Sequence, residues 1–283
     1  MASEAQGLFA VDHEPEHRMD PPDRCKGGVT STLAALDLGL APYGPVQALQ
    51  ARLRHAVAGG VIPGVLLLLE HEPVITLGSR GAESDLRDIG RLRDRAVAVA
   101  RSERGGQATL HAPGQLVSYP IVPIPRRDLG AYVRGLEEIL IVLLGEVGVV
   151  ARRRESHPGV YVGENKIASV GLRCQRWVAS HGTSLNVTID LSLFDLMISC
   201  GEPELKQTSL RVATGRDIPM ERVKALYIEA ARRVFGWVFS PLRTASYLEV
   251  DTLLGLGATP PGAMPTAGFE PAAPGSGGQC SIP

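Results

Sequence analysis

The sequence is poor in several features that mark whole classes of protein. Its 29 basic and 30 acidic side chains nearly cancel, and aromatic residues make up only 5% of the 283 residues. A chain without a basic surplus and with few rings for base stacking is poorly suited to bind nucleic acid. The longest apolar run, ILIVLL at 139–144, is too short to cross a membrane. These shortages argue against nucleic-acid and membrane partners, whereas 44% hydrophobic residues suffice for a full core.

Cysteine is also scarce, and its spacing excludes two common motifs. The four cysteines, Cys25, Cys174, Cys200 and Cys280, stand singly, with no C-x-x-C pair. A zinc ribbon or a thioredoxin-type motif is therefore excluded, and the pattern is typical of a reducing, intracellular compartment. The first twenty residues lack a basic start followed by an apolar stretch, so no secretory signal is predicted. The expected location is the cytoplasm.

Composition divides the chain into three segments. Residues 1–31 are polar and interrupted by proline and glycine, which predicts a mobile N-terminal arm. Residues 257–283 hold six glycines and six prolines, a composition that predicts a disordered tail. Residues 32–256 are therefore expected to form the folded body.

Apolar periodicity within that body predicts both helices and strands. Helices are expected over 44–60, 128–149 and 219–237, the second capped by Asp128 and the third opened by Pro219. Residues 64–81 predict two strands, the first covered on both faces, and 159–190 predict a hairpin with further strands. This alternation predicts an α+β or mixed α/β domain with helices packed on a sheet.

Four stretches contain residues suited to chemistry, and each also has an ordinary structural explanation. RGGQATLHAPGQLVSYPI at 104–121 joins a glycine pair, which permits close backbone approach to a ligand, to the lone His111. It equally fits a glycine-rich hairpin with a buried histidine, and it lacks the spacing of a phosphate-binding loop. Lys166, in GENKIASVGLR, is either an exposed turn lysine or a desolvated one beside a thiol. His181 stands in SHGTSLNV, and Cys200 in DLMISCGEPELKQTSL is either a small core residue or a nucleophile.

The order of these stretches carries more information than any one of them. LLLLEHEPVITLG, RGGQATLHAPGQLVSYPI, KIASVGLR, HGTSLNV and SCGEPELKQTSL follow one another along residues 33–240. This series resembles the octanoyltransferases, or lipoyl(octanoyl) transferases, which act in protein lipoylation. The resemblance implies a central mixed β-sheet flanked by helices, as in biotin and lipoate protein ligases. It makes residues 32–256 an octanoyltransferase catalytic domain.

The resemblance also implies the reaction and its partners. The family transfers an octanoyl group from octanoyl-acyl carrier protein to a lysine of a lipoyl domain, through a cysteine thioester. The implied acceptors are lipoyl domains of 2-oxo acid dehydrogenase complexes and the glycine cleavage H protein. No metal or nucleotide cofactor is expected, because the thioester donor is already activated.

The family's functional residues map onto this sequence position by position. The nucleophile falls on Cys200, and the lysine that lowers the thiol pKa and then moves a proton falls on Lys166. His111 and His181 are assigned to positioning rather than to base catalysis. The implied substrate-binding residues are Arg104, Gly105, Gly106, Gln107, Ala108, Thr109, Leu110, His111, Ser169, Val170, Gly171, Gly182, Thr183 and Ser184.

Three positions depart from the family pattern. Ala112 stands where the family usually has glycine, and it would strain the loop if that position requires a positive φ. Ser199 replaces the proline before the nucleophile, and Glu202 stands where an apolar residue is common. A carboxylate at Glu202 would oppose the effect of Lys166 on the thiol.

Three other functions are compatible with the same residues. An ATP-dependent lipoate or biotin-type protein ligase would activate a free acid and would not need Cys200. A cysteine hydrolase would use Cys200 with His111 or His181. A non-catalytic module would bind the acyl carrier or the lipoyl domain without turnover.

Overall fold

The computed structural model describes residues 31–154 and 158–257. The predicted arm and tail lie outside these ranges except for their inner end residues, and so do Cys25 and Cys280. The boundaries of the folded body at 32 and 256 stay a prediction.

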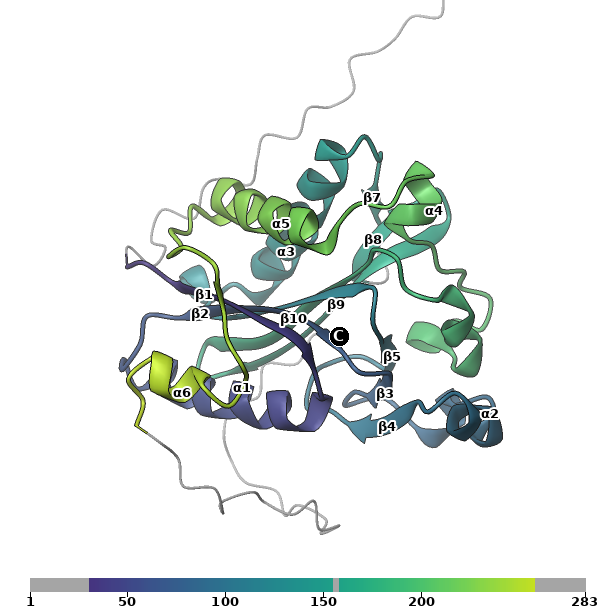
Figure 1. The fold of residues 1–283 in the computed structure, drawn as a ribbon, viewed down its shortest axis with the longest axis horizontal. Coiled ribbons are helices and arrows are strands. Elements are labelled where there is room, and N and C mark those ends of the chain that lie inside the picture. Colours follow the sequence, from purple (N-terminus) through teal and green to yellow (C-terminus); the bar gives the residue numbers. More distant parts are fainter. Residues whose placement is uncertain (1–30, 155–157, 258–283) are drawn as a thin grey trace, which may run out of the picture.

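A mixed sheet runs through the middle of the described part of the chain (Figure 1). Its strand order is β11-β1-β2-β6-β10-β9-β8-β7. β1 pairs in parallel with β2 and β11, whereas every other neighbouring pair is antiparallel. The strands are β1 (Ala34–Ala41), β2 (Val65–His71), β6 (Gln115–Ile121), β7 (Arg152–Arg153), β8 (Gly159–Val162), β9 (Asn165–Gln175), β10 (Val178–Asn186) and β11 (Arg243–Thr244).

Helices cover both faces of this sheet, which confirms the predicted fold class. Figure 1 shows α3 (Leu129–Glu146) and α5 (Met220–Phe235) above the sheet and α1 (Tyr43–Ala58) below it. The shorter helices are α2 (Ile89–Asp94), α4 (Leu210–Thr214), α6 (Val250–Leu253), η1 (Glu83–Asp85), η2 (Pro125–Arg127), η3 (Leu191–Leu196) and η4 (Ser199–Gly201). Across residues 31–154 and 158–257, no helix has the length and apolarity needed to span a bilayer.

The run of leucines in β2 explains how one sheet has two cores. Leu66 and Leu68 point into the core between the sheet and helices α3 and α5. Leu67 and Leu69 point into the core between the sheet and α1. All four are fully buried, because alternate side chains of a strand leave on opposite faces. A continuous apolar strand covered on both sides was predicted from the sequence and is confirmed.

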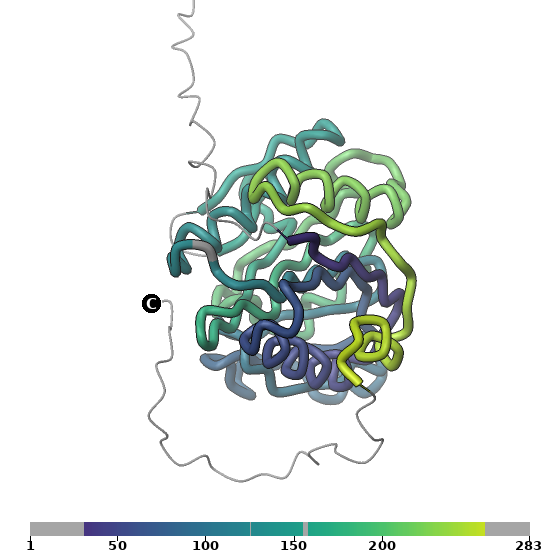
Figure 2. Tube along the Cα trace, turned by 90° about the vertical axis from the view of Figure 1, so that its left-hand side faces the viewer, coloured from purple at the N-terminus to yellow at the C-terminus, as the bar shows by residue number. Residues whose placement is uncertain are grey.

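The helix predictions are also confirmed, with shorter ends. The Asp128 side chain accepts a hydrogen bond of 2.8 Å from the backbone N–H of Ala131 and so caps α3. Pro219 is the N-cap of α5 rather than a residue of its first turn. At the other end of the described chain, α6 lies against α1 (Figure 2), where Arg52 and Asp251 form an ion pair of 2.9 Å.

A second, three-stranded sheet was not predicted. After the turn at Glu72 and Pro73 the chain leaves the main sheet, and β3 (Val74–Leu77) pairs with β4 (Ala98–Arg101) and β5 (Ala108–His111). Its apolar side chains, among them Ile75 and Leu110, pack with Leu193 and Leu196 in a third core. The small sheet therefore holds β5, the segment that follows the Arg-Gly-Gly sequence, next to η4.

The contact between α3 and α5 leads to a prediction about stability. A Cβ at Gly135 would overlap the ring of Phe235, which is stacked on Trp237 at a centroid distance of 4.3 Å and cannot easily move. Gly135→Ala should therefore lower the free energy of unfolding by about 1–3 kcal/mol. Gly145→Ala, on the same helix but with no atom within 4 Å of its Cβ, should raise it by a few tenths to about 1 kcal/mol.

Urea unfolding of the two variants checks this pair of outcomes. Equal effects of the two substitutions would show that helix propensity, and not the ring contact, decides the result.

Candidate active site

Cys200 lies in the tight turn η4 and has an unusual backbone conformation. Its φ is +56° and that of the following Gly201 is +73°. Side chains rarely adopt this region, and non-glycine residues found there often belong to functional sites. A Cβ on Gly201 would also overlap the side chain of Gln107. The turn thus requires glycine at position 201 and holds Cys200 in a conformation that cysteine rarely adopts, with its side chain half-buried.

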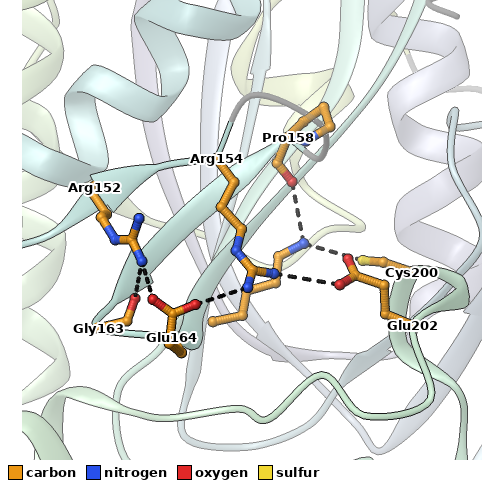
Figure 3. A network of polar contacts seen from close by, with 8 residues as sticks. Arg152, Arg154, Pro158, Gly163, Glu164, Cys200 and Glu202 are labelled. Carbon is orange, nitrogen blue, oxygen red and sulfur yellow. Dashed lines mark hydrogen bonds and ion pairs between the residues drawn. The ribbon is translucent and has the colours of Figure 1, made fainter.

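Lys166, the second residue of β9, meets this turn. Its side chain is 1% exposed, and its Nζ donates to the Sγ of Cys200 at 3.1 Å and to the carbonyl of Pro158 at 3.2 Å (Figure 3). A Cβ on Gly159 would lie 2.6 Å from the Lys166 Cε, so the glycine at the start of β8 makes room for the lysine. Lys166 is therefore the desolvated lysine, and not the exposed one, of the two possibilities in the sequence.

Two opposing effects set the charge of Lys166. Burial lowers its pKa, but the charge of Cys200 and the ring hydroxyl of Tyr161 raise it, and the balance lies above the ordinary value of 10.5. The Nζ also lies 5.6 Å from the centre of the Tyr161 ring. Lys166 therefore stands beside the sulfur as an ammonium.

The Arg-Gly-Gly segment forms a stiff turn beside η4. The guanidinium of Arg104 is buried and donates to the carbonyls of Thr76 at 2.7 Å, Gln107 at 2.8 Å and Gly105 at 3.0 Å. The backbone N–H of Gly105 donates to the carbonyl of Leu172 at 2.8 Å. Burial lowers the pKa of Arg104 from its ordinary value. These bonds fix the turn between β3 and β9, with Gln107 against Gly201.

The two other predicted binding segments lie side by side in the main sheet. Gly182 pairs with Gly171 across β10 and β9. In the same register Thr183 pairs with Val170 and Ser184 with Ser169. Thr183 is buried, and its Oγ1 lies 2.7 Å from the Oγ of Ser118 on β6. The two segments that were predicted from the sequence are therefore direct neighbours in the sheet.

The end of the predicted binding stretch, Ala108 to His111, is strand β5 of the small sheet. Leu110 belongs to the core of that sheet, whereas Val170 and Leu172 border the core beneath α3 and α5. Leu110 on β5 and the two residues of β9 therefore lie in different cores.

His71, His111 and His181 form a buried cluster beside the α1 face. The rings of His71 and His111 are 5.6 Å apart, and Tyr119 lies 5.9 Å from both His71 and His181. Burial lowers the pKa of His71 to about 4 and that of His181 to about 3, and it holds the pKa of His111 well below the ordinary value. All three imidazoles are thus neutral at neutral pH.

A chain of hydrogen bonds connects this cluster to Lys166. His111 Nδ1 lies 2.8 Å from the Gln115 side chain, which donates to Asn186 at 2.8 Å. Asn186 in turn donates to the carbonyl of Thr208 at 3.0 Å, and the Thr208 N–H donates to the carbonyl of Lys166 at 2.8 Å. The segment that returns from the Cys200 turn is therefore pinned to the strand that carries Lys166.

The expected strain at Ala112 is not found. Ala112 does not have a positive φ, and its side chain is buried in the third core. The conformation that favours glycine occurs at Gly114, with φ +86°, where a Cβ would lie 2.6 Å from the backbone nitrogen of Ile189. The loop thus accepts alanine in place of the family's glycine.

Sequence reasoning missed several residues of the site. Tyr161 is the cross-strand partner of Lys166, a register that the two-residue turn at Gly163 and Glu164 would have given. Arg154 pairs with Glu202 at 3.4 Å across 48 residues, and no local pattern indicates such a contact.

Solved structures share this fold. A bi-partite lipoate protein ligase from Thermoplasma acidophilum superposes with a TM-score of 0.63 over 80% of this chain and 91% of that one, at 17% identity. The fold defines the class of protein: an α+β domain of the lipoate protein ligase type. In this chain the domain carries a lysine–cysteine pair at the start of β9.

Comparison of sequences assigns the chain more narrowly. The model of the lipoyl protein ligase A/B catalytic domain family matches residues 42–232. The octanoyltransferase of Rubrobacter xylanophilus is 42% identical over 72% of this chain and 95% of its own length. That of Syntrophotalea carbinolica is 44% identical over 67% and 88%. The chain belongs to the lipoyl protein ligase A/B catalytic domain family, and within it to the octanoyltransferases, which are acyltransferases.

The buried histidines lead to a prediction about pH. In the unfolded chain an imidazole takes up a proton below its ordinary pKa of 6.5, but His71 stays neutral in the folded protein down to about 4 and His181 to about 3. The unfolded chain therefore binds more protons in this window, and their contribution to stability, complete above pH 6.5, is lost as the pH falls toward 4. Between about pH 7.5 and about 5.5 each should cost about 1 kcal/mol of unfolding free energy.

Urea titrations at several pH values measure this slope. His71→Gln should reduce the slope of unfolding free energy against pH by the contribution of one buried histidine. His55→Gln, at an exposed position of α1, should leave the slope unchanged. A wild-type slope in His71→Gln would contradict the assignment.

Proposed function

We propose that this octanoyltransferase forms an octanoyl thioester on Cys200, taking the acyl group from octanoyl-acyl carrier protein and passing it to a lysine of a lipoyl domain. The observation that supports this most directly is the 3.1 Å contact between the Lys166 ammonium and the Cys200 sulfur. A thiolate is the form of cysteine that attacks a thioester, and a neighbouring ammonium favours it. Cys200 and Lys166 are the proposed catalytic residues.

In the first step the Cys200 thiolate attacks the carbonyl carbon of the donor thioester. The new carbon–sulfur bond forms, and the bond to the carrier's thiol breaks. The Lys166 ammonium gives its proton to the departing thiolate, so the carrier leaves as a thiol and the lysine is left neutral.

In the second step the charge balance at Lys166 is reversed. A thioester on Cys200 carries no anion, so the largest effect that raises the pKa of Lys166 is removed, whereas burial continues to favour the neutral form. The acceptor amine attacks the thioester, Lys166 takes the amine's proton, and Cys200 leaves as a thiolate. The ammonium–thiolate pair is then restored.

The proposed binding residues fit this reaction by position. The Arg104–Gln107 turn contacts the Cys200 turn through Gln107, and the paired segments of β9 and β10 continue from Lys166. The solved ligase of T. acidophilum was studied with its E2 lipoyl domain. We infer the same class of acceptor here: lipoyl domains of 2-oxo acid dehydrogenase complexes or the glycine cleavage H protein. The cytoplasm stays the predicted compartment, on the sequence grounds given above.

The thioester can be detected directly. Octanoyl-acyl carrier protein mixed with the enzyme, without acceptor, should leave one octanoyl group on the Cys200 peptide by mass spectrometry. Cys200→Ser should lose this adduct and slow transfer by at least about 10³-fold. Cys174→Ser, which changes the half-buried cysteine of β9, is the matched control and should keep both.

Other outcomes would favour other functions. Transfer by Cys200→Ser at the wild-type rate would contradict the thioester. ATP-dependent use of free octanoate would indicate a ligase, and release of free octanoate as fast as transfer would indicate a hydrolase.

Lys166 has two roles that two substitutions should separate. Lys166→Met removes the cation, so alkylation of Cys200 by iodoacetamide at neutral pH should slow about tenfold, and transfer should fall by about 10²–10⁴-fold. Lys166→Arg keeps the cation but cannot accept a proton in the second step. It should alkylate faster than the methionine variant while transferring as poorly, and rapid transfer by Lys166→Arg would contradict the proton role.

A further inference from the structure

A carboxylate stands close to the nucleophile in this chain. Glu202 follows Cys200 by two residues, and its backbone N–H closes the same turn by donating to the carbonyl of Ser199 at 2.9 Å. Figure 3 shows the Cys200 and Glu202 side chains leaving this turn together. A second anion at this place repels a thiolate, and it competes with the sulfur for the ammonium of Lys166.

Arg154 meets this carboxylate from the other side of the site. Its Nη1 lies 3.4 Å from the Oε2 of Glu202, and its Nη2 lies 3.1 Å from the Oε2 of Glu164 (Figure 3). Its guanidinium also lies 4.8 Å from the centre of the Tyr161 ring, the ring over which the Lys166 Nζ lies at 5.6 Å. Arg154 and Lys166 thus share one aromatic ring and are directed to different anions.

Both ends of this contact are held in place. Glu164 sits in the turn between β8 and β9 and is also paired with Arg152. The Arg154 and Glu202 side chains are 28% and 31% exposed, so water screens their attraction only in part. The guanidinium fork suits simultaneous contacts with two carboxylates better than an ammonium does.

We propose that Arg154 is a positioning residue for acyl transfer: by holding Glu202 it keeps that carboxylate off the Lys166 ammonium, which stays on the Cys200 sulfur. This rests on the proposed thioester function and adds a residue that the family resemblance did not supply. It also accounts for the tolerance of a glutamate at a position where the family commonly has an apolar residue.

The charged and titratable groups around Cys200 come from several elements. They are Lys166 on β9, Tyr161 on β8, Arg154 after β7, Glu202 after η4, Glu137 on α3, which interacts electrostatically with Lys166, and, at longer range, the buried Arg104 before β5. Glu137 pairs with Arg153 at 3.2 Å and accepts from the Gly159 N–H at 2.8 Å. Glu202 is the carboxylate that Arg154 holds, so it is the group expected to approach the Lys166 ammonium when Arg154 is removed.

The test measures alkylation of Cys200 by iodoacetamide across a range of pH, followed at the Cys200 peptide. Arg154→Met should slow alkylation at neutral pH about three- to tenfold and shift its pH profile to higher pH. The double variant Arg154→Met with Glu202→Gln should recover to within about twofold of the wild type, because the carboxylate is gone. Arg154→Lys should give a partial rescue, since it keeps the charge but not the fork.

Arg152→Met is the matched control, because Arg152 pairs with Glu164 in the turn between β8 and β9; its alkylation rate should stay within about twofold of the wild type. An unshifted profile in Arg154→Met would overturn the proposal. So would a double variant as slow as Arg154→Met alone, which would mean that Arg154 acts on the fold and not on Glu202. Alkylation needs no acyl donor, so this result stands apart from the octanoyl adduct, whose absence would contradict the proposed function instead.

Discussion

An ammonium almost wholly removed from water, 3.1 Å from a sulfur atom, is the interaction on which this site depends. Burial alone disfavours a charged lysine, and an uncompensated buried charge is among the most destabilising groups a protein can contain. The carbonyl of Pro158 satisfies one N–H, but it brings no charge. The charge of Cys200 and the ring hydroxyl of Tyr161 raise the pKa of Lys166 against the effect of burial, and so keep the amine charged. The charge of Lys166 therefore depends on the residues that the fold places beside it.

The fold fixes this pair through backbone contacts on both sides. Residues 206–208 return from the Cys200 turn and bond to both the N–H and the carbonyl of Lys166. Asn186 ties that return to β10, and Gln115 ties Asn186 to the histidine cluster. Gly159 leaves room for the Lys166 side chain, and Gly201 leaves room for the Gln107 side chain against the Cys200 turn. Two residues 34 positions apart thus keep one geometry, although one lies on a strand and the other in a tight turn.

The sequence predicted those parts of the structure that depend on local pattern. Apolar periodicity predicted the helices and the strand β2 that is buried on both faces. These elements and the order of the family motifs then predicted the fold class. The three-stranded sheet was not, because the turn at Glu72 and Pro73 resembles an ordinary hairpin and only tertiary packing directs β3 elsewhere. Arg154 with Glu202 and the chain through Asn186 join distant segments, and no single-sequence pattern records such pairs. At Ala112 strain was expected only if the loop required a positive φ there, and Ala112 does not have one.

A second buried cation makes the surroundings of Cys200 electropositive. The hydrogen bonds of Arg104 that join it to Thr76, Gln107 and Gly105 all end on neutral oxygens, so they satisfy its donors without cancelling its charge. Arg104 therefore adds to Lys166 a fixed positive potential at the sulfur, and this potential acts on every anion nearby. It stabilises a thiolate, and it would equally stabilise the negative oxygen that forms when a thioester carbonyl is attacked. Glu202 brings a carboxylate to the same turn as Cys200, and Arg154 pairs with that carboxylate at 3.4 Å. A site with two buried cations attracts any nearby anion, so the Glu202 carboxylate has to be kept away from the cation that contacts the Cys200 sulfur.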